Sequence, residues 1–519
     1  MLTVDLYPYQ SPALDLFISR GNLLIDMDMG LGKTTTSLAC AEQLLGDGRI
    51  RTCVIICPAG LIMQWAASIA NVTDVETKLV SHEGRTFAIP TEDWCLIIDG
   101  SPKRREKLLE QAFEKRPNYV IASHDIAAAS WRKFRELGDL TIIDEATCLK
   151  NPKAQRARGL HKIVTDYRIA LTGTPIENRL EEAFTIMKWV DPDLFGPWPV
   201  FEKRHIIRNG RGWIIGYKNL SWFHQELSKA SYRKRATDPD VAPFMPSVRH
   251  VRWDVRLDAA TMAVYRSIME DLEREYGRVD EDELPVGRAM SIHQAALMLL
   301  DHPGLLHDSA EEYLRGTGGS EYAAELVASG RLNGLTATPK LDVLVERLQP
   351  YLSQDGCKII IVSRYVGMLT RIADRLKGVG HVIYHGGMSR AAQQSAVHAF
   401  QTDPGIRVLI MSHAGAYGLD LPQAQLIVNY DIARSAGQAR QINARHVRAS
   451  SSFSSVGVAD LVTLDTVEDR AYRRLGLKNR IVDAGVDGIG IDWTDRLIVA
   501  GDTLREHVLS AIGGLSTKS

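Results

Sequence analysis

Several features that define protein classes are missing from this sequence. Its six cysteines are scattered and form no C-x-x-C pair, so neither a zinc site nor a disulfide framework is indicated. No run of about 18 apolar residues could span a membrane, and the N-terminus lacks a basic-then-apolar secretion pattern. The net charge of −1 creates no overall field for nucleic acid. We therefore expect an intracellular protein without a membrane partner.

The length of 519 residues exceeds the usual size of one domain, and 45% of the residues are hydrophobic, enough for buried parallel sheets. Apolar strands and helices alternate over residues 1–190 and again over 336–485, which predicts an α/β fold of two tandem parallel-sheet lobes. Residues 191–335 are predicted to be an inserted, mainly helical region with a β-hairpin at Asn209-Gly210, and 486–519 an appendage without an assigned role. The strands are expected near Leu23, Val54, Ile97, Val120, Ile142 and Ile169, then near Ile360, Val382, Val408, Ile427 and Val462.

A glycine-rich turn follows the first predicted strand, residues 22–27, and opens a predicted helix. Its residues are Met29, Gly30, Leu31, Gly32, Lys33 and Thr34. The backbone N–H groups of such a turn converge on one point, where the helix dipole also favours negative charge. Lys33 would contact the β- and γ-phosphates of a nucleotide, and the Thr34 hydroxyl would ligate magnesium. Met27 stands where the first glycine of the G-x-x-x-x-G-K-[ST] pattern belongs, so a chance glycine-rich helix cap is the alternative.

A predicted strand over residues 140–143 ends in Asp144-Glu145. At the carboxyl end of a parallel strand, Asp144 would lie beside the phosphate turn and hold magnesium through water. Glu145 would then orient or deprotonate the attacking water. The alternative is a solvated acidic turn, which the phosphate turn upstream makes the weaker interpretation.

Further motifs, in order along nearly the whole chain, resemble the Swi/Snf-type ATPases, a branch of the superfamily-two helicases and translocases. That family also lacks the first glycine of the phosphate loop. The segments that carry the resemblance are 6–10, 28–34, Cys57-Pro58 with Trp65, Leu149-Lys150-Asn151, 171–182, His302-Pro303, 359–363, 385–387, 414–421, 441–448 and 466–470. Residues 201–205, Asn219-Leu220 and Glu226-Leu227 are similar to the compact annealing-helicase-like branch.

The resemblance implies a motor of two RecA-like lobes that binds ATP and Mg²⁺ between them. Gln10 would read the adenine, although a glutamine after Tyr-Pro-Tyr is also a common loop residue. Arg445 and Arg448, at i, i+3 spacing on one helix face, would stabilise charge on the transferred phosphoryl group, unless they belong to a solvated basic helix. The remaining implied nucleotide contacts are Gly418, Asp420 and Gln441.

Residues 198–235 contain nine Lys/Arg against two Asp/Glu, together with several aromatic residues. Basic residues among aromatics suit a surface that grips a nucleic-acid backbone. The alternative is a small subdomain whose aromatic residues form its own core. The predicted nucleic-acid contacts are Ser123, Arg233, Lys234, Arg235, Ser363, His385 and Ser412.

The sequence therefore predicts a monomeric, ATP-dependent DNA helicase or translocase, with duplex DNA favoured. The alternatives are an RNA helicase and a nucleotide-gated DNA clamp with little turnover. Three positions depart from the family: Thr147 replaces the usual His after Asp-Glu-x, His413 replaces an Arg, and Ser450-Ser451 replace Gly-Gln. None removes a catalytic atom. The change at Thr147 puts in doubt the contact that couples the Asp-Glu turn to residues 171–178.

Overall fold

The computed structural model describes residues 2–82, 85–177, 179–210, 212–277, 286–413, 419, 421–433, 436–443, 446–447, 453–473, 486 and 496–498. The chain forms two compact units, one built mainly from residues 1–246 and the other mainly from residues 247–477. The predicted site residues Gly418, Asp420, Arg445 and Arg448 lie outside the described residues. No helix among the described residues is long and apolar enough to cross a membrane.

The first unit is built on a seven-stranded parallel sheet in the order β11-β1-β8-β7-β2-β6-β5. Its central strands are buried on both faces, which explains their continuous apolar runs. The strands are β1 (Asn22–Met27), β2 (Cys53–Cys57), β5 (Cys95–Ile98), β6 (Tyr119–Ser123), β7 (Leu140–Ile143), β8 (Tyr167–Thr172) and β11 (Ser231–Lys234). All six strands predicted for this lobe are confirmed.

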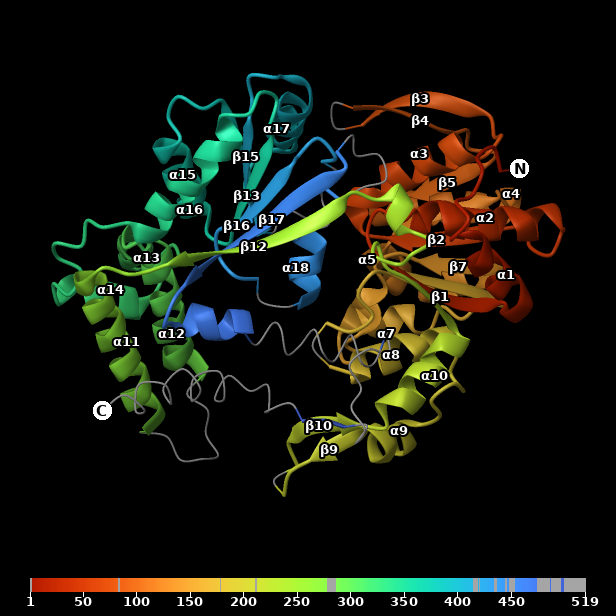
Figure 1. Cartoon of the computed structure of the whole chain (residues 1–519). Coiled ribbons are helices and arrows are strands. Elements are labelled where there is room, and N and C mark those ends of the chain that lie inside the picture. Colours follow the sequence, from red (N-terminus) through yellow and green to blue (C-terminus); the bar gives the residue numbers. More distant parts are fainter. Residues whose placement is uncertain are drawn as a thin grey trace. The chain divides into compact units, whose positions relative to one another are not determined.

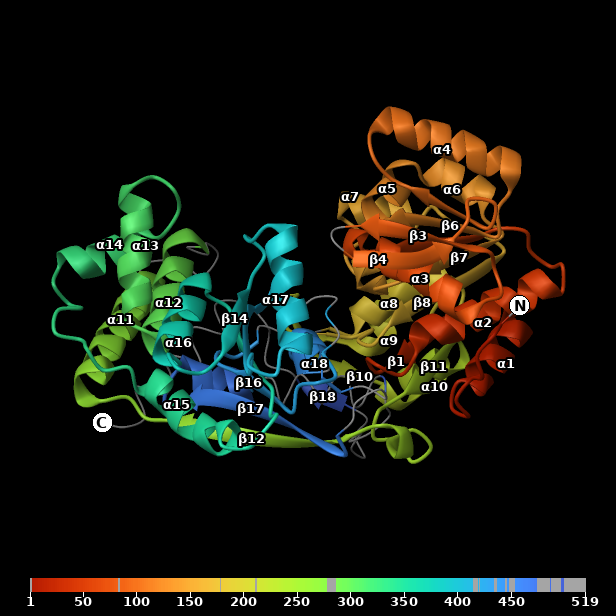
Figure 2. The same ribbon diagram turned by 90° about the horizontal axis from the view of Figure 1, so that it is seen from above.

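Helices cover this sheet on the way from one strand to the next. Leu23, Ile25 and Ile55 face α1, α2 and α3 in one core, while α4 and α6 contact each other (Figure 2). An antiparallel hairpin of β3 (Thr77–His82) and β4 (Arg85–Pro90) packs beside α3 (Figure 1). The helices are α1 (Ser11–Arg20), α2 (Lys33–Gly46), α3 (Ile62–Val72), α4 (Pro102–Lys115), α5 (His124–Ala129), α6 (Trp131–Leu137), α7 (Gln155–Leu160) and α8 (Glu181–Val190), with short 3-10 turns η1 (Ala59–Leu61) and η2 (Ala146–Leu149).

A small aromatic subdomain follows α8 in the first unit. It consists of α9 (Trp198–His205), β9 (Ile206–Arg208), β10 (Ile214–Lys218) and α10 (Leu220–Lys229), with β18 (Arg496–Ile498) paired to β10. The antiparallel β9–β10 pair confirms the hairpin predicted at Asn209-Gly210. The rings of Phe195 and Phe223 stack at 4.9 Å, and Phe201 packs edge-on against both. The aromatic residues of this segment therefore form a core of their own.

The second unit contains a six-stranded parallel sheet in the order β12-β17-β16-β13-β15-β14. Its five predicted strands are confirmed, and the long β12 runs beside β17 (Figure 1). The strands are β12 (Ser247–Val255), β13 (Ile359–Ser363), β14 (His381–Tyr384), β15 (Val408–Ser412), β16 (Leu426–Asn429) and β17 (Ser455–Thr463). The helices that follow them are α15 (Pro339–Leu352), α16 (Val366–Arg375), α17 (Arg390–Thr402) and α18 (Ala436–Asn443).

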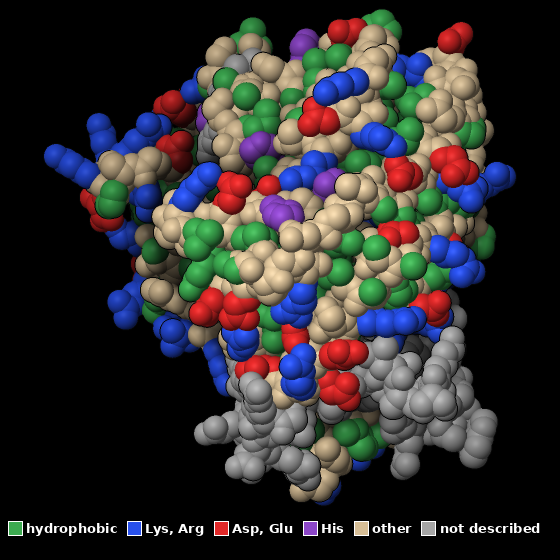
Figure 3. All heavy atoms as spheres, turned by 90° about the vertical axis from the view of Figure 1, so that its left-hand side faces the viewer, with side chains coloured by type: hydrophobic (Ala, Val, Ile, Leu, Met, Phe, Trp, Pro, Cys, Tyr) green, Lys and Arg blue, Asp and Glu red, His purple; other side chains and the backbone are tan. Residues whose placement is uncertain are grey.

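Four more helices of the second unit lie between β12 and α15: α11 (Ala259–Gly277), α12 (Val286–Asp301), α13 (Gly304–Leu314) and α14 (Glu321–Ala328). They bury Tyr265, Leu299, Leu306 and Tyr322 in a separate core. On the face of the molecule in Figure 3, Lys and Arg side chains are interspersed with Asp and Glu. That face therefore carries no broad field of one sign.

The segment 191–335, predicted as a single insert, is shared by both units. Residues up to Pro246 belong to the first unit, where β11 pairs with β1, and residues from Ser247 belong to the second, where β12 pairs with β17. Both strands were missed because they lie at sheet edges. Their sequences, SYRK and SVRHVRWDV, carry polar side chains instead of the apolar run of a central strand.

Candidate active site

The predicted phosphate turn lies between β1 and α2 in the first unit. Gly30 and Gly32 adopt left-handed backbone angles, with φ of 83° and 77°. A Cβ atom on Gly32 would also lie 2.3 Å from the Gln10 side-chain nitrogen. Glycine is therefore required at position 32 by both conformation and space. Because α2 begins at Lys33, its first N–H groups have no intrahelical acceptors and can bind an anion.

The Lys33 side chain folds back over this turn. Its ammonium group donates to the carbonyl oxygens of Met27 at 2.9 Å and Asp28 at 3.4 Å. Backbone carbonyls are weaker partners for an ammonium group than the oxygens of a phosphate. The structure therefore places Lys33 where a bound phosphate could take over these contacts.

Gln10 is buried against the phosphate turn, with 2% of its surface exposed. Its amide nitrogen donates to the carbonyls of Leu31 at 3.1 Å and Gly32 at 3.3 Å, and its amide oxygen accepts from the Tyr7 N–H at 2.9 Å. Both ends of the amide thus hold the protein backbone. The contact with adenine stays a prediction, and the observed role of Gln10 is to brace the turn.

Asp144 lies partly buried at the end of β7 and is held from two sides. One carboxylate oxygen accepts from the Trp65 indole N–H at 2.8 Å, and the other accepts from the Glu145 N–H at 2.8 Å. Burial raises the pKa of Asp144, while these two donors and the Lys33 charge oppose that rise. Glu145 itself has a left-handed φ of 48°, a strained conformation for a non-glycine residue at the turn out of the strand.

The turn after β8 closes against the phosphate turn. A Cβ atom at Gly173 would lie 3.0 Å from the Met27 carbonyl oxygen and 3.5 Å from the Lys33 ammonium nitrogen. The Thr172 hydroxyl accepts from the Thr174 N–H at 3.0 Å and shapes this turn. Three strand ends, from β1, β7 and β8, therefore meet at the carboxyl edge of one sheet, where ligands of parallel α/β sheets bind.

The oxygen groups at this edge fit a magnesium–nucleotide complex. The Asp144 carboxylate and the Thr34 hydroxyl are hard oxygen ligands, and Mg²⁺ usually takes only one or two protein ligands, with phosphate oxygens and waters for the rest. Among the described residues, no group of three His, Cys, Asp or Glu side chains could hold a metal ion by itself. A site completed by substrate phosphates is consistent with that finding.

Three of the predicted nucleic-acid contacts have buried side chains. The Ser123 hydroxyl caps α5 by accepting from the Ile126 N–H at 3.3 Å, and the Ser363 hydroxyl donates to Asp431 at 2.7 Å. Ser412 is 4% exposed. His385 is partly exposed and its ring accepts from the Gly387 N–H. Of these four residues, only His385 has a partly exposed side chain.

The predicted contacts Arg233, Lys234 and Arg235 lie on or just after β11, and each faces a carboxylate. Arg233 pairs with Asp26 and Asp28, both at 3.0 Å, Lys234 pairs with Asp240 at 2.5 Å, and Arg235 pairs with Asp238 at 2.8 Å. Asp26 is 1% exposed, so the Arg233 pair is internal. The structure thus shows an edge strand tied to its own unit, which does not favour a role for these cations in gripping a phosphate backbone.

Sequence reasoning gave no site role to two residues that shape this edge. His124, at the start of α5, contacts the Asp144 carbonyl through its ring at 2.8 Å. Lys150 reaches the turn after β8, at 2.8 Å from the Thr174 carbonyl oxygen. A cation shortly after the Asp-Glu turn is a sequence signal, but its partners are known only from the fold.

In the second unit, Gln441 lies on α18.

A model of the SNF2-related domain matches residues 10–298, more than half of the chain, and a model of the helicase conserved C-terminal domain matches residues 339–450. The chain belongs to the SNF2 family. That family consists of ATP-hydrolysing helicases and translocases.

Individual relatives are distant. A Bacillus subtilis protein named as an ATP-dependent helicase/translocase, YwqA, is 25% identical over 92% of this chain and 48% of its own length. Mouse chromodomain-helicase-DNA-binding protein 1-like is 24% identical over 91% of this chain and 48% of its own. The chain thus spans about half the length of these curated relatives. The Hef helicase domain of Pyrococcus furiosus shares the fold, with a TM-score of 0.52, 19% identity, and coverage of 90% of this chain and 97% of that one.

Proposed function

We propose that this SNF2-family chain hydrolyses ATP and uses the energy to translocate along duplex DNA. The observation that carries the proposal is the meeting of Lys33, Asp144 and Gly173 at the carboxyl edge of the first sheet. A cation, a partly buried carboxylate and a close-packed glycine turn are together the parts needed to hold a triphosphate for hydrolysis.

Each residue has a separate task in the proposed hydrolysis. The N–H groups at the start of α2 bind the phosphates, and Lys33 exchanges its carbonyl partners for phosphate oxygens. Thr34 and Asp144 would hold Mg²⁺, which neutralises charge on the phosphates. Glu145 orients the attacking water and accepts its proton. Asp144, fixed by Trp65, keeps the Glu145 turn in place.

The second unit is proposed to complete the reaction. Arg445 and Arg448 would stabilise the charge that develops on the transferred phosphoryl group, and Gly418, Asp420 and Gln441 would add nucleotide contacts. If these arginines contact the nucleotide only while it is a triphosphate, binding would favour closure of the motor and hydrolysis would favour its opening. Movement along a strand follows if each unit releases DNA at a different stage.

The proposal that the chain moves along DNA rests on its relatives, because chromodomain-helicase-DNA-binding protein 1-like is named for binding DNA. An RNA helicase remains the second candidate within this class, and a clamp with little turnover is the candidate outside it. Glu145, present at the turn after β7, favours turnover over clamping. We further propose that the motor acts as a monomer inside the cell, with His385 among its DNA contacts.

ATP hydrolysis measured with duplex DNA, single-stranded DNA and RNA decides between these candidates. We expect the largest stimulation with duplex DNA, together with ATP-dependent displacement of a third strand from a triplex. Greater stimulation by RNA would support the RNA helicase. Tight, nucleotide-dependent DNA binding without turnover would support the clamp. Lys33→Ala serves as the control for contaminating ATPases.

A further inference from the structure

Lys150 connects two parts of the active site that are distant in sequence. It lies at the end of η2, shortly after the Asp144-Glu145 turn, and its side chain is 11% exposed. Its ammonium nitrogen lies 2.8 Å from the Thr174 carbonyl oxygen, 3.0 Å from a Glu177 carboxylate oxygen and 3.3 Å from a Glu182 carboxylate oxygen. All three acceptors belong to the segment from β8 to the first turn of α8.

This segment is itself closed by a short hydrogen bond. The Glu182 oxygen nearest Lys150 also accepts from the Glu177 N–H at 2.6 Å. Lys150 therefore sits over a folded turn and not over a single side chain. Thr174 follows Gly173, the residue that packs against the Met27 carbonyl and the Lys33 ammonium group. The contacts thus run without a break from the Asp-Glu turn to the phosphate turn.

Thr147 does not make this connection. Its hydroxyl donates to the Glu145 carbonyl at 3.4 Å, within its own turn. The family's usual histidine at this position is absent, so the Asp-Glu turn needs another group to reach the β8–α8 segment. Among the contacts described for this turn, the one made by Lys150 spans the two segments with a charged hydrogen bond.

We propose that Lys150 is the positioning residue that holds the Asp144-Glu145 turn in register with the Thr172–Thr174 turn during ATP hydrolysis in this chain. The inference rests on the proposed hydrolysis. Lys150 does not contact the nucleotide. It acts through Thr174 and Glu177, so its loss misplaces the attacking water relative to the phosphates and leaves the phosphate turn intact.

The test compares Lys150→Met with the wild-type protein in ATP hydrolysis at saturating duplex DNA. We expect kcat to fall about 10- to 100-fold, the size attributed to a misplacement of about 1 Å, while KM for ATP changes less than about threefold. Tyr217→Phe is the matched control, because the Tyr217 hydroxyl donates to Glu181 at 3.0 Å, one residue from Glu182 on the same helix turn. It should leave kcat unchanged.

A structural role for Lys150 must be separated from a positioning role. Lys150→Met leaves Glu177 and Glu182 facing each other, and that repulsion alone lowers stability. Adding Glu177→Gln and Glu182→Gln removes the repulsion. We expect this triple variant to recover the melting temperature but not kcat. Recovery of kcat together with the melting temperature, or a Lys150→Met kcat within twofold of wild type, would overturn the inference.

Failure of the proposed function gives a different pattern. If the wild-type protein hydrolyses ATP but no polynucleotide stimulates it, translocation is wrong, and Lys150 is still judged by the unstimulated kcat. If the wild-type protein has no turnover that Lys33→Ala abolishes, hydrolysis and the Lys150 inference fail together.

Discussion

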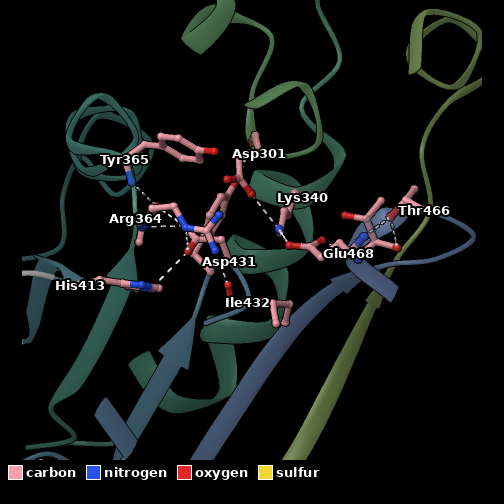
Figure 4. A network of polar contacts seen from close by, with 12 residues as sticks. Asp301, Lys340, Arg364, Tyr365, His413, Asp431, Ile432, Thr466 and Glu468 are labelled. Carbon is pink, nitrogen blue, oxygen red and sulfur yellow. Dashed lines mark hydrogen bonds and ion pairs between the residues drawn. The ribbon is translucent and has the colours of Figure 1, made fainter. Parts of the chain in front are cut away.

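Both units place charged side chains at the carboxyl edge of a parallel sheet, but the two edges partner these charges differently. At the edge of the first unit, Lys33 contacts backbone carbonyls of its own turn. At the edge of the second unit, Lys340 is 0% exposed and pairs with the carboxylates of Asp301 and Glu468 (Figure 4). Lys33 thus contacts backbone carbonyls, whereas Lys340 contacts acidic side chains of its own unit.

The second edge extends this internal pairing along the strand ends. Asp431, after β16, accepts from the Ser363 hydroxyl and the Arg364 N–H, both at 2.7 Å, and lies 3.2 Å from the His413 ring (Figure 4). Burial alone would raise the pKa of Asp431, but the charges of His413 and Arg364 and the Ser363 hydrogen bond hold it well below its usual value.

The difference between Lys33 and Lys340 distinguishes two roles of a charged side chain. A charge whose partners are protein charges fixes the packing of the segments that carry them, and removing one partner leaves another buried and unpaired. A charge that rests on carbonyls can change partners without that penalty. We therefore expect changes in the first edge to alter activity and changes in the second to alter stability.

The largest effect is expected from Glu145→Gln. The amide keeps the shape of the side chain but cannot accept a proton, and positioned general bases contribute about 100- to 10,000-fold in rate. Turnover at saturating DNA should fall by that factor, while binding of a fluorescent ATP analogue and the melting temperature stay the same. Retention of more than half of the stimulated activity would remove Glu145 from the mechanism.

Lys340→Met should have the largest effect on stability. It leaves the buried acidic groups of Asp301 and Glu468 without their shared cation, and breaking a buried ion pair costs about 3–5 kcal/mol. Urea unfolding of the second unit would measure this loss. The triple variant with Asp301→Asn and Glu468→Gln should recover most of it. A loss of under about 1 kcal/mol for Lys340→Met, the value typical of an exposed pair, would contradict the assignment of this edge to stability.

The contrast also shows what the sequence could predict. The apolar runs of β1, β7 and β13 are local patterns, so the strands of both lobes followed from them. The order of the glycine turn and Asp144-Glu145 is also local, and it carries the proposed nucleotide site. The partners of each charge are set by segments far apart in the chain. Lys340 meets Asp301 and Glu468 across 39 and 128 residues, and no local pattern indicates which lysine is paired internally.

The same limit explains the edge strands. β11 and β12 are polar and lie at sheet edges, so only their pairing with β1 and β17 identifies them. Arg233, placed on β11 by the fold, is the partner of buried Asp26, and its contact with nucleic acid stays a prediction.

Lys33→Ala tests the other half of the comparison. Hydrogen bonds to charged groups contribute about 1.5–3 kcal/mol, so the affinity for ATP should fall about 10- to 100-fold. The melting temperature should change little, because the two hydrogen bonds described for the ammonium group go to backbone carbonyls. A thermal-shift assay with and without ATP measures both effects. A strong loss of stability without nucleotide would erase the difference between Lys33 and Lys340.

A smaller effect is expected from the pH. Burial, opposed by Lys340 and reinforced by the charges of Asp431 and Glu468, raises the pKa of Asp301 to about 8. A carboxyl group with a raised folded-state pKa contributes stability that is full below its unfolded pKa of about 3.9 and is lost as the pH rises through the folded value. Between about pH 4 and about pH 8 the second unit should therefore lose stability, and Asp301→Asn should flatten that slope. An unchanged slope in the variant would show that Asp301 is already ionised at low pH.

The smallest effect on DNA binding is expected from neutralising Arg233, Lys234 and Arg235 together. Removal of one cation that binds a phosphate would flatten the plot of log affinity against log salt concentration by roughly 0.9 on duplex DNA. Because all three cations face carboxylates of their own unit, we expect the slope to stay the same. The melting temperature should fall instead, since Asp26 is left buried without its arginine. A slope flatter by about two or more is the change expected when at least two phosphates are bound. That result would mean that these ion pairs open when DNA binds, and that β11 contacts DNA in addition to pairing with β1.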